Sequence, residues 1–133
     1  MTVGQTIYLG PWTVDFLFCD MEYDAEMILL AMYDIDADEE SIDDVLDLIS
    51  SCSFNCGLTA VNSVIRKAVV VIGPSTSNVE FLNTFCHELY HLGEKLATSH
   101  GYDAEGEAPA YTAGESARQL ADIVCAFACP SEY

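Results

Sequence analysis

Apolar residues recur along this chain with two different spacings, and the spacing typical of strands marks its beginning and its middle. Residues 6–19 are rich in β-branched and aromatic side chains on either side of a Gly-Pro pair, which predicts one interrupted strand or a short hairpin. Residues 57–73 hold two apolar runs separated by Asn62-Ser63. We expect a hairpin there, with the run at 69–72 as a buried strand.

The spacing typical of helices marks much of the remaining chain. Residues 23–33 are apolar and contain the helix-forming residues Ala, Glu, Met and Leu, which favours a short helix. A second helix is expected at 41–49, because an acidic turn precedes it and suits the helix dipole. Its apolar residues fall at i, i+3, i+4 and i+7, the spacing of one buried stripe: Ile42, Val45, Leu46 and Ile49.

Two longer helices are expected in the C-terminal half. Thr76 or Ser77 can cap the first helix, and Glu80 three residues after Ser77 would complete a capping box. Ser99-His100-Gly101 predicts the end of this helix. The second helix should span about 107–127, where many alanines keep it slim enough to pack closely. Separate strands and helices of this kind predict an α+β fold, with a small sheet or hairpin packed on the two long helices.

Length and charge limit the domain organisation and the classes of partner. The chain has 133 residues, of which 51% are hydrophobic, so we expect one domain over residues 1–133 with a single core. It contains 22 acidic and 4 basic residues, and its net charge is −18 at pH 7. Because phosphate binding depends on Lys and Arg, this balance argues against a nucleic-acid partner. It favours a basic substrate or partner instead.

The sequence shows no sign of export or of membrane insertion. The first ten residues lack a charged region followed by an apolar run, and no apolar stretch approaches 18 residues. We therefore expect no membrane partner and a cytoplasmic location, where the 6 Cys should mostly remain thiols. We expect most of these cysteines to be buried as small hydrophobic residues, including Cys86 and two pairs spaced four apart: Cys52 with Cys56 and Cys125 with Cys129.

One short segment carries a recognisable chemical arrangement. His87-Glu88-Leu89-Tyr90-His91 has the HExxH pattern. Residues four apart share a helix face, so both imidazoles can bind one cation while Glu88 sits beside its open coordination position. The pattern is typical of zinc-dependent hydrolases, and we expect Zn2+ as the cofactor. The plainer alternative is two surface histidines that flank a solvated glutamate.

A catalytic zinc site needs a third protein ligand and an exchangeable water. Geometry favours a carboxylate that returns on the helix after Gly101. The candidates in this part of the chain are Asp103, Glu105, Glu107, Glu115 and His100.

The charges of such a site indicate a hydrolytic mechanism. Zinc lowers the pKa of a bound water and polarises a carbonyl group, and Glu88 would act as general base towards that water. A further donor to the oxyanion is needed, for which Tyr90 and Tyr111 are candidates. Tyr111 lies one helical turn beyond Glu107, so it could face the site and is the expected catalytic tyrosine; the alternative is a half-buried packing tyrosine. His100 is better explained as a cation or cap at the helix C-terminus.

Over residues 57–120 the chain resembles the gluzincin group of zinc metallopeptidases, especially small single-domain zincin-like proteins of bacteria and their phages. The similar features are a β-hairpin, the HExxH helix, a short turn, and a helix that opens with an ExxA pattern at Glu107. The resemblance implies a minimal zincin-like fold with its metal-site core at about 57–127. It also implies a peptide or protein substrate, bound along a sheet edge for which 58–65 is the candidate.

The same resemblance assigns roles to individual residues. It implies that His87, His91 and Glu107 bind zinc and that Glu88 is the general base. Glu115 is the second choice for the third ligand and Glu105 the third. A chain this small lacks the second lobe that walls the cleft of larger metallopeptidases, so the substrate, the oligomeric state and the need for a partner remain open.

Three other interpretations are possible. Asp34-x-Asp36-x-Asp38 suggests a calcium loop, but Glu39 and Val45 stand where an EF-hand requires Gly and Glu. We therefore expect a solvated acidic surface there. The chain could instead be an inactive or partner-dependent zincin-like module that binds a basic partner, although a purely structural zinc site would not use Glu88. An acidic decoy of nucleic acid would explain the charge but not the HExxH pattern.

Overall fold

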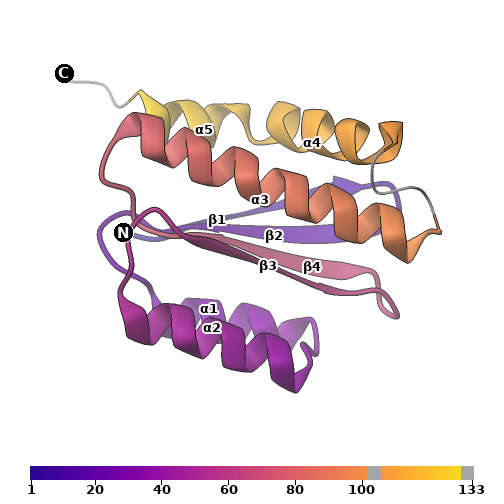
Figure 1. The fold of residues 1–133 in the computed structure, drawn as a ribbon, viewed down its shortest axis with the longest axis horizontal. Coiled ribbons are helices and arrows are strands. Elements are labelled where there is room, and N and C mark those ends of the chain that lie inside the picture. Colours follow the sequence, from indigo (N-terminus) through magenta and orange to yellow (C-terminus); the bar gives the residue numbers. More distant parts are fainter. Residues whose placement is uncertain (102–105, 130–133) are drawn as a thin grey trace.

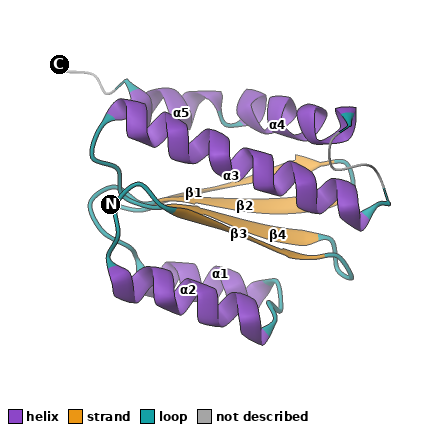
Figure 2. Cartoon of the chain, viewed as in Figure 1, coloured by secondary structure: helices purple, strands orange, loops and turns teal. Residues whose placement is uncertain are grey.

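A mixed β-sheet lies between two layers of helices in the computed structural model, which describes residues 1–101 and 106–129 (Figure 1). Helices α1 and α2 cover one face of the sheet, and α3, α4 and α5 cover the other (Figure 2). This arrangement is an α+β fold, as the sequence predicts. In chain order the described elements are β1 (Val3–Leu9), β2 (Trp12–Phe18), α1 (Ala25–Asp34), α2 (Glu39–Ser51), β3 (Gly57–Asn62), β4 (Lys67–Ile72), α3 (Asn78–Ser99), α4 (Glu107–Gln119) and α5 (Ala121–Ala128).

The four strands have the order β1-β2-β4-β3. The first hairpin pairs β1 with β2 and turns at Gly10, whose φ of 58° is accessible to glycine at no steric cost. The second hairpin pairs β3 with β4, and the two hairpins join through the parallel pair β2 and β4. The hairpin expected at 57–73 is confirmed, and of the two alternatives for 6–19 the structure has the hairpin. β3 is an edge strand of the sheet.

The central strands bury both of their faces, which explains the continuous apolar run at 69–72. On β4, Val70 and Ile72 face α3, α4 and α5, whereas Val69 and Val71 face α1 and α2. On β2, alternate large side chains pack on the α3 side: Trp12, Val14, Phe16 and Phe18.

Short polar side chains set the first turns of three helices. The Asp38 carboxylate accepts a hydrogen bond from the Ser41 amide at 2.8 Å, and Asp24 does the same for α1. At α3, the Ser77 hydroxyl accepts from the Glu80 amide at 3.1 Å. The predicted cap at Ser77 is confirmed, and Asp38 of the acidic stretch serves as a helix cap.

The predicted single helix at 107–127 is wrong, because the chain breaks into α4 and α5 at Leu120. Leu120 is buried, and the break directs the apolar side of α5 onto the core beneath α3. Phe127 of α5 packs against Phe18 and Phe81 with ring centroids 5.5 Å apart in both pairs. Tertiary packing therefore overrides the uninterrupted helical pattern.

The expected burial of the cysteines is also wrong for most of them. All six are free thiols; Cys56 is half-buried, and the exposed members are Cys52, Cys86, Cys125 and Cys129. Cys86 lies on the side of α3 that the sheet does not cover, which explains its exposure. Within the described residues, no helix is both long and apolar enough to cross a membrane.

Candidate metal centre

His87 and His91 meet on one exposed side of α3. Their Nε2 atoms lie 3.0 Å apart, and the two rings stand at 84° to each other with centroids 4.5 Å apart. Because the residues are four apart, consecutive helical turns bring the two rings together. The structure therefore places two imidazole nitrogens as the HExxH pattern predicts.

The separation of the two nitrogens is close to what a shared zinc ion needs. Zinc binds imidazole nitrogen at about 2.0–2.1 Å, and tetrahedral geometry then places two ligand nitrogens about 3.3 Å apart. The observed 3.0 Å is shorter by about 0.3 Å, which small side-chain rotations can supply. The same distance also fits a hydrogen bond in which one imidazole donates Nε2–H to the other.

A carboxylate lies beside the outer nitrogen of His91. Glu94 Oε1 is 3.4 Å from His91 Nδ1, at the i, i+3 spacing of neighbours on a helix. A carboxylate in this position favours the proton on Nδ1 and leaves the lone pair on Nε2, the nitrogen that faces His87. Sequence reasoning missed Glu94, although its spacing from His91 could have identified it.

Glu88 points towards the sheet, about 100° around α3 from His87 and about 60° from His91. Its side chain is only 4% exposed, and its Oε1 atom accepts a hydrogen bond of 2.8 Å from the hydroxyl of Thr59 on β3. A Cβ atom at Gly57 would lie 2.8 Å from Cγ of Glu88 and 2.7 Å from the carbonyl oxygen of Val71. The absence of a side chain at Gly57 is therefore what lets the Glu88 carboxylate lie against β3.

The hydrogen-bond alternation of the sheet shows which backbone groups of β3 are directed outwards. The Gly73 amide donates to Cys56 O at 2.8 Å, one position beyond the partners Gly57 and Ile72. Hydrogen-bonded and non-hydrogen-bonded pairs alternate along an antiparallel ladder. The N–H and C=O groups of Gly57, Thr59 and Val61 therefore point away from β4, towards the side of β3 that no other described strand pairs with.

The expected third ligand is not gathered with the two histidines. Glu107 is the exposed first residue of α4. Helix α4 contacts α3 at Gly93, where an added Cβ would lie 2.9 Å from the carbonyl oxygen of Pro109. At about 100° per residue, His91 is about 200° around α3 from Gly93 and faces away from α4. Consistent with this, the described residues contain no group of three or more His, Cys, Asp or Glu side chains that could hold a metal ion.

The other candidates for the third ligand have different positions. Glu115 accepts hydrogen bonds from Arg118 Nε at 2.9 Å and from the Gln119 amide at 3.0 Å, and these partners lower the pKa of its carboxyl to about 2. Asp103 and Glu105 lie outside the described residues. Glu115 is therefore held by partners on its own helix.

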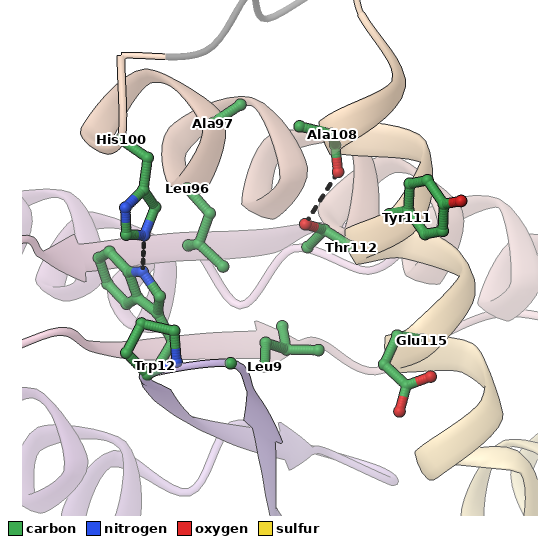
Figure 3. A pocket seen from close by; sticks show the side chains of 11 residues that line it. Leu9, Trp12, Leu96, Ala97, His100, Ala108, Tyr111, Thr112 and Glu115 are labelled. Carbon is green, nitrogen blue, oxygen red and sulfur yellow. Dashed lines mark hydrogen bonds between the residues drawn. The ribbon is translucent and has the colours of Figure 1, made fainter.

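Tyr111 and His100 lie at a separate pocket, whose volume is about 340 Å³ (Figure 3). Tyr111 is 78% exposed, and the indole of Trp12 donates to His100 Nε2 at 2.7 Å on the opposite wall. By contrast, Tyr90 lies beside His91, with ring centroids 6.1 Å apart. Of the two tyrosine candidates, Tyr90 is the one that the structure places next to a motif histidine.

Comparisons of the chain with protein-family models, with curated proteins and with solved structures found no match.

Proposed function

We propose that this protein is a zinc-dependent peptidase whose metal is held by His87 and His91, with Glu88 as general base. The observation that carries the proposal is the 3.0 Å approach of the two Nε2 atoms on α3, one of them ordered by the Glu94 carboxylate. Two neutral imidazoles at this distance could bind one zinc ion in place of the hydrogen bond between them. When bound, zinc would supply an activated water and polarise a carbonyl group.

In this proposal the chain's own residues have separate roles. His87 and His91 offer neutral imidazole nitrogens, and Glu94 orients His91 through Nδ1. Glu88 would take a proton from the attacking water and return it to the leaving amine. Thr59 holds Oε1 of this carboxylate and so fixes its position beside β3.

We propose Glu107 as the third ligand, as the gluzincin resemblance implies. The carboxylate begins α4, which packs directly against α3 at Gly93. To reach the histidines, the first turn of α4 would have to move around α3 towards His91. Binding would therefore couple the position of α4 to the metal. A tyrosine would complete the site by donating to the oxyanion, and Tyr90 is better placed than Tyr111.

The substrate in this proposal is an extended peptide along β3. Its outward-directed backbone groups lie on the strand that touches Glu88, so a bound peptide would pass close to the general base. The opposite edge of the sheet is occupied, because the Gln119 side chain donates to Tyr8 O at 2.7 Å and accepts from the Tyr8 amide at 3.1 Å. The net charge of −18 favours basic peptides.

Six free thiols agree with a reducing compartment such as the cytoplasm.

A second function, a non-catalytic module that binds a partner through its acidic surface, is supported by a specific observation. Glu107 is not gathered with the histidines, so the described residues provide two metal ligands rather than three. In this alternative, Glu88 serves the packing of α3 on β3 through Thr59. The two functions differ in whether Glu88 contributes to hydrolysis.

Replacing Glu88→Gln distinguishes the two functions. The amide keeps the shape of the side chain but cannot act as a base, so zinc content should be unchanged while cleavage of an unfolded basic polypeptide falls by about 10²–10⁴-fold. Cleavage is measured by mass spectrometry of the products, and zinc by elemental analysis. Glu80→Gln, which removes the same charge from the first turn of α3, is the matched control and should keep full activity. Zinc-loaded wild-type protein that cleaves nothing would favour the binding module.

A further inference from the structure

The Lys95 side chain donates a hydrogen bond to an outward-directed carbonyl group in the middle of β3. Its Nζ atom donates to Thr59 O at 3.1 Å. Thr59 belongs to the set whose backbone groups point away from β4, so this carbonyl is one that an added strand would use. The same residue holds Glu88 through its side chain, which places the lysine contact directly beside the proposed general base.

The charge of Lys95 also reaches the helix on the other face of the sheet. Hydrogen bonds from the hydroxyl and the amide of Ser41 lower the pKa of Asp38 at the start of α2, and the field of Lys95 adds a smaller lowering. The lysine side chain therefore starts on α3 and ends at the unpaired side of β3. Lysine at an unpaired strand edge also opposes unwanted strand pairing, because a strand that adds there must displace its charge.

We propose that Lys95 is a displaceable gate on β3: its ammonium group holds the Thr59 carbonyl until the N–H of an extended peptide replaces it. This gate regulates access to the site described above and in that sense rests on the proposed function, but peptide binding itself requires neither metal nor hydrolysis. The peptide would use the remaining outward groups of Gly57 and Val61 in register. A ligand would therefore bind to β3 only if its N–H group can replace Lys95 at the Thr59 carbonyl.

Peptide binding to metal-free protein that carries Glu88→Gln tests this proposal. The probe is a blocked seven-residue peptide of alternating threonine and valine with lysine at each end, which is extended and basic. Titration followed by backbone amide NMR should move the resonances of Gly57, Thr59 and Val61 more than those of Leu58 and Ala60. Lys95→Ala should tighten binding about five-fold, equivalent to about 1 kcal/mol, because one protein hydrogen bond no longer competes. Lys95→Arg, which keeps a donor and the charge, should bind as the parent does.

Several results would overturn the gate. Equal affinity of Lys95→Ala and the parent would show that the lysine contact does not compete with peptide. Shifts without the alternating pattern would place the peptide elsewhere. Self-association of Lys95→Ala in sedimentation, in place of peptide binding, would show that the lysine guards β3 against a second copy of the chain. None of these results depends on zinc, whereas failure of the proposed function would appear as absent hydrolysis with intact peptide binding.

Discussion

The properties of the site depend on a few side chains whose neighbours lie far away in the sequence. Glu88 is next to His87 in the chain, yet it points to β3 and contacts Thr59, 29 residues earlier. The HExxH spacing was enough to predict the convergence of the two imidazoles, because both lie on one helix. It could not predict the contact with Thr59, because that contact depends on how α3 lies across the sheet.

Gly57→Ala should disturb the Glu88 position more than it disturbs the fold. The new Cβ would meet Glu88 Cγ at 2.8 Å and Val71 O at 2.7 Å, so we expect a loss of about 1–3 kcal/mol in the free energy of unfolding. Activity of the surviving folded protein should also fall, because the carboxylate must leave β3. Urea denaturation and peptide cleavage measure the two effects.

Gly114→Ala is the matched control for this change. A Cβ at Gly114 meets nothing within 4 Å and lies inside helix α4, so the substitution should stabilise the protein by up to about 1 kcal/mol. If Gly57→Ala changes the free energy of unfolding no more than Gly114→Ala does, the tight contact between Glu88 and β3 is not present in solution.

Among the elements, those that depend on local sequence were predicted best. The Ser77 cap and the two hairpins follow from neighbouring residues and are present. The break at Leu120 and the exposure of Cys86 depend on packing between elements that are distant in sequence, and the sequence pattern missed both. The position of α4 also depends on packing between distant elements, because α4 approaches α3 closely where Pro109 contacts Gly93.

Helix α4 is the element expected to supply the third ligand. Glu107→Gln should weaken zinc binding by at least about 10-fold, because it removes a charged ligand oxygen from the site. Competition with a chromophoric chelator measures the affinity. Glu115→Gln is the control on the same helix and should leave it unchanged, since Arg118 and Gln119 already hold Glu115. A loss of zinc affinity in Glu115→Gln but not in Glu107→Gln would identify Glu115 as the third ligand.

The whole molecule combines a strongly acidic charge with a sheet edge, β3, that no other described strand pairs with. Net charge −18 concentrates cations around the protein, both metal ions and basic peptides. The edge of β1 is occupied by Gln119, and Lys95 holds one carbonyl of β3. If the proposed function holds, a basic extended ligand would be drawn towards this surface and would pair with β3 beside Glu88.

X-ray absorption at the zinc edge of the zinc-loaded protein is the most direct test of the proposed metal centre. We predict a first shell that contains two imidazole nitrogens at about 2.0–2.1 Å together with oxygen ligands, and loss of one imidazole in His87→Ala. The outer-shell scattering typical of imidazole identifies the ring. A zinc ion surrounded by oxygen alone, with the same spectrum in His87→Ala, would contradict a metal site on α3.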